Sequence, residues 1–409
     1  MKVLGIIAEY NPFHNGHLYH LNESKKISEC THTIAIMSGH FLQRGEPALI
    51  DKWKRAEIAV KNGIDLVLEL PYAFSCQSAE IFAYGSIKTL DELGLVDVLA
   101  FGSESGKIAE LERIAFLLAN ESDVFKTTLH EKLKQGFSFP KARELAIERA
   151  IGGEIQIDKS NDILGIEYLK WLYRLNSKIK PMAVKRTKVG YHSNFALDGI
   201  ASATFIRNLI FEDPNWSEKL FQLVPAVTYQ EVMDYKRNHE FNKLEHYSKE
   251  ICYSIIRSNI LELKSIPDVS EGIENKLYAC GSKSKNMDEL IKCVNSKRYT
   301  YTRISRILCH LMNNYGKTQM DDFFKSKIFK PYARVLSFND NGREILKKIS
   351  GSSDIPMVVN LGKSVKNLDE KQKQCLKFDT RSTDMFFLKS NPDRLGADFV
   401  TKPVYVKKK

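Results

Sequence analysis

Short apolar runs alternate with longer amphipathic stretches over the first half of the chain. The apolar runs predict buried strands at residues 3–8, 33–37, 66–70, 98–101 and 181–184. Helical periodicity lies between them, and predicts helices at residues 17–28, 51–62, 78–93 and 162–175. Strands that alternate with helices are typical of a parallel sheet with right-handed crossovers. We therefore expect an α/β fold built on a parallel sheet.

The alternation ends near residue 210, where Glu212, Asp213 and Pro214 indicate a boundary turn. A mostly helical pattern follows, and a last segment mixes short strands with turns. In these two parts we expect helices at residues 246–263 and 301–314, strands at 333–338 and 357–359, and a turn at 339–342. The pattern thus predicts three parts, namely residues 1–210, 211–330 and 331–409.

Composition narrows the class of protein. The chain has 409 residues, of which 43% are apolar and 27% charged, an ordinary globular mixture with room for two or three domains. No apolar run approaches the 18 residues or so of a transmembrane helix, so we expect no membrane contact. The seven cysteines form no C-x-x-C pair, which argues against zinc-ribbon and thioredoxin-like sites. We expect unpaired thiols in a reducing cytoplasm.

The charge is distributed unevenly between the two halves. Residues 1–200 carry 25 Lys and Arg against 25 Asp and Glu, whereas residues 201–409 carry 36 against 25, the whole net charge of +11. The excess is steepest at 291–350, with 13 basic against 4 acidic side chains. A solubility surface would explain some excess, but one so one-sided favours a polyanion partner, and nucleic acid first.

The loop after the first strand carries the strongest chemical signal. Residues 9–17 read EYNPFHNGH, and a helix follows. Pro12 fixes the loop, Gly16 lets the backbone approach a ligand, and the helix start offers amides that bind anions. His14 and His17 face the same place, at the carboxyl end of a strand, where α/β sheets bind ligands. Such a site suits nucleotide phosphates and the charge that develops as pyrophosphate leaves.

Two other interpretations of this loop compete. Two histidines in an ordinary turn would need no ligand, and His20 is as suited to packing as to binding. A metal site of His14, His17 and His20 lacks a nearby carboxylate or thiolate to complete it, so we expect no protein-bound metal.

The loop resembles the H-x-G-H nucleotidyltransferase superfamily, whose members bind ATP on a Rossmann-like sheet and release pyrophosphate. The superfamily's second motif is a Ser/Thr-rich helix start that ends in Arg, and residues 202–207 read SATFIR. There Ser202 would cap a helix and Arg207 would reach phosphate oxygens. A plain N-cap with a surface arginine is the alternative.

The resemblance narrows to the tRNA(Met) cytidine acetate ligase family. It rests on EYNPFHNGH at 9–17, MSGHFLQRGEP at 37–47, SNDILG at 160–165 and YTYTRISR at 299–306, and it spans nearly the whole chain. The resemblance implies an ATP-dependent ligase that makes acetyl-adenylate from acetate. It then acetylates N4 of the wobble cytidine of elongator tRNA(Met). ATP and acetate are thus the implied small substrates, Mg²⁺ would accompany the phosphates, and no obligate protein partner is evident.

The resemblance also assigns site residues. His14, His17 and Arg207 would be catalytic. The ATP-binding set is Ile7, Ala8, Glu9, Tyr10, Asn11, Pro12, Phe13, His14, Asn15, Gly16, His17, His20, Gly102, Asn161, Arg186 and Thr187. From the residues alone, Gly102 is equally a strand-end turn, Asn161 equally a helix N-cap, and Arg186 equally part of a basic loop.

Two further segments are candidates for substrate contact. In the loop 38–47, which Gly39 and Gly45 would make mobile, His40, Gln43 and Arg44 could meet acetate or the target base; a plain surface loop is the alternative. In the basic half, cations interleave with tyrosines, which suits phosphates and unpaired bases. The expected tRNA contacts are Lys297, Arg298, Arg303 and Arg306, and a solvated helix beside a core stripe competes with them.

Two other functions remain open at this point. A small-molecule nucleotidyltransferase that acts on a cofactor precursor would share every N-terminal motif, although it would need no basic surface. The second is an RNA-binding protein that keeps a nucleotide-binding fold but has no catalytic activity. The presence of both His14 and His17 argues against it.

Overall fold

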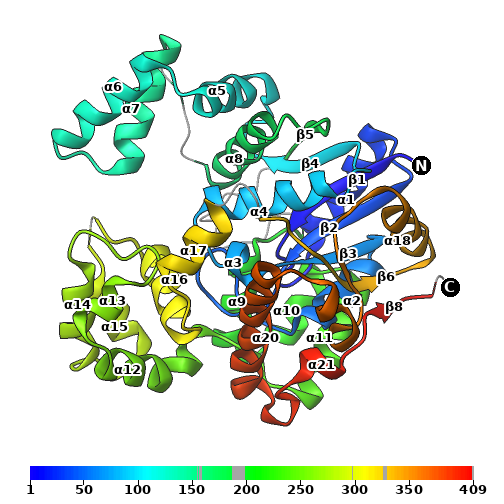
Figure 1. Cartoon of the computed structure of the whole chain (residues 1–409). Helices are drawn as coiled ribbons and strands as arrows, with labels where there is room; N and C mark the ends of the chain where they lie inside the picture. Colours follow the sequence, from blue (N-terminus) through cyan, green and yellow to red (C-terminus); the bar gives the residue numbers. More distant parts are fainter. Residues whose placement is uncertain (154, 156–158, 187–198, 297, 326–328, 408–409) are drawn as a thin grey trace.

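The computed structural model of the chain describes residues 1–153, 155, 159–186, 199–296, 298–325 and 329–407. One eight-stranded sheet runs through the molecule (Figure 1), in the order β5-β4-β1-β2-β3-β6-β7, with β8 paired to β6. The strands are β1 Val3–Ala8, β2 His32–Ser38, β3 Leu66–Leu70, β4 Val98–Ser103, β5 Lys180–Lys185, β6 Ala333–Phe338, β7 Met357–Val358 and β8 Val404–Tyr405.

The first five strands are parallel, and their order is that of a Rossmann-like sheet. Every residue of β3 and all but the first of β2 are buried, as expected for central strands that are covered on both faces. The expected α/β fold with a mostly parallel sheet is therefore confirmed.

The helices that connect these strands and follow them were predicted in outline. The sequence left residues 103–161 unassigned, and the part of this segment that the structure describes holds three complete helices. The helices are α1 Asn15–Ser28, α2 Lys52–Lys61, α3 Tyr72–Ser75, α4 Ala79–Glu92, α5 Ile108–Asn120, α6 Asp123–Lys134, α7 Phe139–Ile151, α8 Ser160–Arg174, α9 Ala203–Glu212, α10 Trp216–Leu223, α11 Ala226–Asn238, α12 Ser248–Arg257, α13 Ile260–Lys264, α14 Ile273–Gly281, α15 Met287–Val294, α16 Tyr301–Met312, α17 Lys317–Phe324, α18 Asp340–Ser352, α19 Leu361–Ser364, α20 Glu370–Ser390 and α21 Ala397–Val400, with 3₁₀ turns at Leu244–Tyr247, Val365–Asn367 and Pro392–Arg394.

Two helical lobes stand away from the sheet. Figure 1 shows α5, α6 and α7 at one corner and α12 to α15 at another, with α16 and α17 between the second lobe and the sheet. Among the described residues, no helix is both long and apolar enough to cross a membrane.

Two local predictions in the second half were wrong. The single helix expected at 246–263 is broken, because the Asn259 side chain accepts a hydrogen bond from the Glu262 amide and starts α13 afresh. The turn expected at 339–342 is a helix start, since Asn339 caps α18 and accepts from the Gly342 amide. Gly342 is required there, as a Cβ would lie 2.1 Å from the Asp65 carbonyl oxygen.

The last segment, residues 331–407, completes the sheet of the first. β6 pairs antiparallel with β3, and β7 and β8 each pair parallel with β6. The division into three parts stays a prediction, but the first and the third share one sheet and one core.

The expectation of unpaired thiols was wrong for two cysteines. Cys280 on α14 and Cys293 on α15 form a disulfide, with Cα atoms 6.0 Å apart. The two helices pack on each other, so a local contact brings the thiols together. The other five cysteines are free.

Candidate active site

The carboxyl end of β1 opens to solvent. Ile7, Ala8 and Glu9 are only half-buried, although β1 lies between β2 and β4 in the middle of the sheet. The strand order reverses between β1 and β4, and such switch points form the ligand crevice of doubly wound sheets. The H-x-G-H loop follows β1 and Gly102 lies in β4, so both flank this crevice.

His14 and His17 are fixed to each other by the helix start. The Gly16 amide donates to Nδ1 of His14 at 3.1 Å, and the His14 amide donates to Nδ1 of His17 at 3.2 Å. The helix therefore begins at Asn15, two residues before the expected start, with His14 as its N-cap. The two rings stack, with centroids 3.7 Å apart and planes 25° from parallel.

These contacts determine which ring nitrogens can donate. Both imidazoles are neutral near pH 7, because burial and then the Arg186 charge lower the pKa of His14 to about 3, while burial and then His14 hold that of His17 well below its usual value. In each ring Nδ1 accepts from a backbone amide, so the single proton lies on Nε2. The pair thus offers two imidazole N–H donors at a helix start where the amides of His14, Gly16 and His17 are already hydrogen-bonded.

His20, Gly102 and Arg186 lie close together near the carboxyl ends of β4 and β5. A Cβ on Gly102 would lie 3.5 Å from Cγ of Arg186 and 4.0 Å from Cδ2 of His20. The Arg186 charge depresses the pKa of His14, His17 and His20, so its guanidinium lies near all three rings. Burial, then Arg186, lowers the pKa of His20 to about 4. Arg186 is exposed at the end of β5, and a cation there suits phosphate oxygens.

Arg207 reaches the loop from α9. Its Nη1 donates to the Asn11 carbonyl at 3.0 Å, and its Nη2 pairs with Glu46 at 2.5 Å. Ser202 caps α9 through the Phe205 amide, as expected of this motif. The side chain of Asn15 donates to the carbonyls of Gly199 and Gln222, which ties α1 to the segment that carries Arg207.

The remaining predicted ATP ligands are partly placed. Tyr10, Asn11, Pro12 and Phe13 are buried in the loop itself, where the Asn11 side chain accepts from the Leu49 amide at 2.7 Å. Asn161 lies in the first turn of α8 rather than at its N-cap, and donates to Glu104 at 2.6 Å. Thr187 lies outside the described residues.

The loop 38–47 is packed rather than mobile. The Leu42 amide donates to the Glu46 carbonyl and the Gly45 amide to that of Leu42, both at 2.9 Å. His40 is fully buried, and its ring contacts Thr383 and the Lys52 amide, so the expectation that it meets a substrate was wrong. The Gln43 amide donates to Glu9 at 2.8 Å, next to the crevice.

Sequence reasoning missed two residues of this site. Arg55 on α2 is fully buried and joins two loops, since it donates to the Glu9 carbonyl at 2.7 Å and to the Gly39 carbonyl. Glu46 contacts Arg207. A charged residue within the buried face of a predicted helix could have signalled Arg55, whereas no local signal marks Glu46.

The predicted tRNA contacts are only partly exposed. Arg298 is exposed, whereas the side chain of Arg306 is 11% exposed and pairs with Asp268 at 2.8 Å. Arg303 donates to the Asp268 carbonyl and to Ser270. Lys297 lies outside the described residues. The two α16 arginines therefore hold the loop around Asp268 against the helix.

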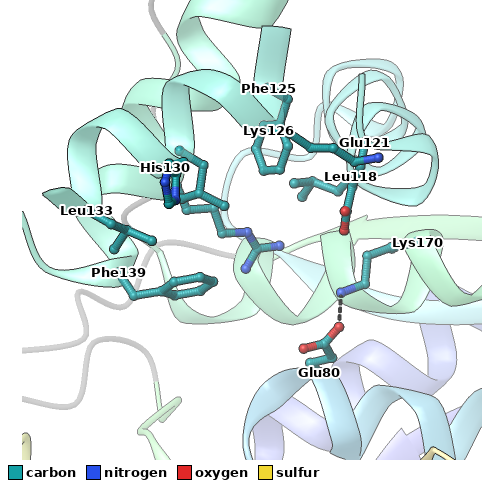
Figure 2. Close-up of a pocket in the computed structure, with 11 residues that line it drawn as sticks. Glu80, Leu118, Glu121, Phe125, Lys126, His130, Leu133, Phe139 and Lys170 are labelled. Carbon is teal, nitrogen blue, oxygen red and sulfur yellow. Dashed lines mark hydrogen bonds and ion pairs between the residues drawn. The ribbon is translucent and has the colours of Figure 1, made fainter. Parts of the chain in front are cut away.

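A cavity of about 340 Å³ lies elsewhere, in the α5–α7 lobe. Figure 2 shows its lining, with Leu133 and Phe139 on one side and Lys170, paired to Glu80, on the other. None of the predicted site residues lines it. Among the residues that the structure describes, no group of three or more His, Cys, Asp or Glu side chains could hold a metal ion.

Comparison of the whole chain with known proteins identifies its relatives. A model of the HIGH nucleotidyl transferase family matches residues 1–397. The tRNA(Met) cytidine acetate ligase of Thermoanaerobacter sp. (strain X514) is 43% identical, over 98% of both chains. That of Alkaliphilus metalliredigens is 40% identical, over 100% of this chain and 99% of its own.

Solved structures agree over the full length. The crystal structure of Thermotoga maritima TmcAL bound with alpha-thio ATP has a TM-score of 0.92 and 34% identity, and covers 100% of both chains. The apo form of the same protein has a TM-score of 0.94 at 34% identity.

Proposed function

The chain belongs to the tRNA(Met) cytidine acetate ligase family, and from this premise we propose how its residues carry out the reaction. It is an ATP-dependent ligase that modifies tRNA. It activates acetate as acetyl-adenylate and transfers the acetyl group to N4 of the wobble cytidine of elongator tRNA(Met). Since its substrate is a tRNA, we place it in the cytoplasm.

One observation carries the residue roles: two stacked, neutral imidazoles at a helix start beside the sheet's switch point, each with Nδ1 bonded to a backbone amide and Nε2–H left to donate. ATP binds in this crevice, with its adenosine against Gly102 and its phosphates towards His14, His17, Arg186 and Arg207. Acetate attacks the α-phosphorus, and pyrophosphate leaves with the electron pair of the broken P–O bond. The Nε2–H donors stabilise the charge that grows on the phosphate oxygens.

Neutral rather than protonated histidines suit this step. A donor fixed by the backbone needs no reorganisation as charge develops, and burial strengthens its hydrogen bonds. The protein positions the reactants and stabilises charge, while the adenylate itself supplies the activated carbonyl. In the second step the cytidine amine attacks that carbonyl, AMP leaves with the electron pair of the broken C–O bond, and the amine nitrogen loses a proton.

Mg²⁺ fits the site only as a partner of the phosphates. The described residues form no cluster that would hold it alone, and Mg²⁺ commonly needs just one or two carboxylates besides substrate phosphates. Bound there, it would neutralise phosphate charge. Glu9, which directly follows β1 and lies next to the H-x-G-H loop, would supply a carboxylate to the ion.

Acetylation of bulk tRNA tests the function. Incubation with ATP and radiolabelled acetate should give labelled N4-acetylcytidine in elongator tRNA(Met) and pyrophosphate in equal amount. Acetyl-coenzyme A in place of ATP and acetate should give none. Labelling from acetyl-coenzyme A alone, or no labelling at all, would refute the proposal.

The basic half is the proposed tRNA surface, and the exposed Arg298 is its clearest phosphate ligand. Arg298→Ala should weaken tRNA binding and reduce the log–log salt slope by about one unit or somewhat less, because one phosphate contact is lost. Arg306→Ala should instead loosen the Asp268 loop, and so lower stability more than it changes the slope. Filter binding across a salt series separates the two. An unchanged slope in Arg298→Ala would mean that this stretch does not contact tRNA.

A further inference from the structure

The carboxylate of Glu46 lies where three parts of the molecule meet. Its Oε1 accepts from Arg207 of α9 at 2.5 Å. Its charge acts on Glu9 at the end of β1, and on Tyr301 in the first turn of α16. The preceding residue, Gly45, lies directly against α16, since a Cβ there would stand 2.2 Å from the Arg306 amide nitrogen.

Three acceptors orient the guanidinium of Arg207. Nη1 donates to the Asn11 carbonyl at 3.0 Å, and Nη2 donates to Thr204 Oγ1 at 3.5 Å as well as to Glu46. Thr204 lies one turn earlier on the same helix, and Asn11 lies in the H-x-G-H loop. The contact with Glu46 is the charge-assisted one and the shortest, so it constrains the guanidinium most.

The turn that presents Glu46 is fixed at its backbone. Two hydrogen bonds close residues 42–46, Phe41 bridges to Pro47, and the side chains of Phe41 and Leu42 are fully buried. Gly45 has φ +79°, which only glycine adopts without strain, and this conformation allows the close approach to α16. The backbone of Glu46 is therefore held in place by this turn. Its side chain contacts Arg207 from a loop that is not part of the H-x-G-H motif.

We propose that Glu46 is a positioning residue for adenylation, which holds Arg207 in the orientation that contacts the phosphates of ATP. This inference rests on the proposed function. Arg207 is 12% exposed at its side chain and Glu46 30%, so the pair is screened from solvent only in part. The Glu46–Arg207 pair matters because it positions the guanidinium. A misplacement of a phosphate-binding group by about 1 Å can lower the rate by on the order of 100-fold. Glu46 also adds a negative charge near an anionic substrate, which opposes ATP binding.

Glu46 has two effects that can be measured separately. Its hydrogen bond to Arg207 should raise kcat, and its negative charge should raise the KM for ATP. In acetate-dependent pyrophosphate release, Glu46→Ala should lower kcat by about 10- to 100-fold. Glu46→Gln should keep kcat within about fivefold, because its amide oxygen accepts the same hydrogen bond, and should lower the KM for ATP, because the charge is gone. Glu57→Ala is the matched control, since Glu57 pairs with Lys54 and Lys61 on α2 and should leave both constants unchanged.

A double-mutant cycle asks whether Glu46 acts through Arg207. In the Arg207→Ala background, measured in single turnover, Glu46→Ala should change the rate by less than about twofold. The inference would be overturned if Glu46→Ala had the wild-type kcat. It would also be overturned if Glu46→Ala lowered the rate by the same factor in the wild-type and the Arg207→Ala proteins. If Glu46→Ala does not fold, Glu46→Gln decides: a raised KM for ATP or a more than tenfold loss in kcat overturns it. Absence of pyrophosphate release by the wild type would refute the proposed function instead.

Discussion

At the scale of single residues, the site depends on histidines that are kept neutral. Burial and the Arg186 charge lower the pKa of His14, His17 and His20, and Arg207 adds to this effect at His14. Backbone amides at Nδ1 of His14 and His17 leave Nε2–H as the one donor of each ring. The same contacts therefore cap a helix and prepare two donors for phosphate.

The two roles of His14 can be separated by substitution. His14→Ala should lower the free energy of unfolding by about 1 kcal/mol, since the Gly16 amide loses its acceptor, whereas His14→Asn should retain most of that stability. Both should slow pyrophosphate release by on the order of 100- to 1000-fold, because both lose an oriented donor. Urea unfolding and a pyrophosphate assay measure the two effects. A wild-type rate in either variant would place the catalytic donors elsewhere.

The protonation state of these rings is open to direct measurement. Because the pKa of His14 is lowered to about 3 and that of His20 to about 4, their Hε1 resonances should not shift between pH 8 and about 5. Unfolded histidines take up protons below about pH 6.5, so these rings favour the folded state less as pH falls through that value. A midpoint near 6.5 for either resonance in the folded protein would contradict the assignment.

At the scale of elements, the β1–α1 loop is supported by its neighbours rather than by itself. Arg55 of α2 ties it to the loop after β2, and Arg207 of α9 ties it to Glu46. The turn at 42–45 in turn rests on the backbone of α16. A helix of the basic half is thus in direct contact with a loop of the nucleotide half.

A comparison of substitutions at Gly45 and Gly396 can measure the contribution of the contact between Gly45 and α16. Gly45 has φ +79° and Gly396 has φ +75°, but a Cβ would clash with Arg306 at the first and meet open space at the second. Gly396→Ala should cost about 1–2 kcal/mol of stability through the left-handed conformation alone. Gly45→Ala should cost about 1–3 kcal/mol more, because α16 must move. Equal losses in urea unfolding would mean that the turn does not rest on α16.

At the scale of the whole molecule, a buried ionic cluster fastens the last segment to the first. Lys52 contacts Glu69 at 2.8 Å and Asp398 at 2.9 Å, and Arg334 pairs with the same two carboxylates. Glu69 lies on β3 and Arg334 on β6, the antiparallel neighbours in the sheet. All four side chains are at most 5% exposed, so each charge depends on the others for its compensation.

Removing one member should show how far the cluster stabilises the fold. Asp398→Ala leaves Lys52 and Arg334 with a single carboxylate between them, and should lower the free energy of unfolding by about 3–5 kcal/mol. Asp393→Ala, at an exposed aspartate nearby, should change it by less than about 0.5 kcal/mol. Urea unfolding followed by circular dichroism compares the two. A loss in Asp398→Ala no larger than in Asp393→Ala would mean that the cluster contributes little.

Local patterns in the sequence predicted the strands and the helix starts, which depend on residues close together in the chain. Apolar runs placed the strands β1 to β6, because buried strands need such runs wherever they pair; β5 is the exception in burial, since only Val184 in it is buried. The sequence predicted the cap of α9 at Ser202 and the start of α1 to within two residues, since capping involves residues within one turn. The roles of the individual site residues stay predictions.

Only the tertiary structure decided which distant groups meet. Nothing local indicates that residues 333–338 pair with β3, that His40 is buried against Thr383, or that Arg306 faces Asp268 rather than solvent. A charge or an imidazole has the same pattern in sequence whether it binds a ligand or a neighbouring segment. Its partner is set by long-range packing, which brings together residues as far apart as Lys52 and Asp398. For the same reason Glu46 carries no mark in the sequence, and its contact with Arg207 exists only because β2, α9 and α16 converge there.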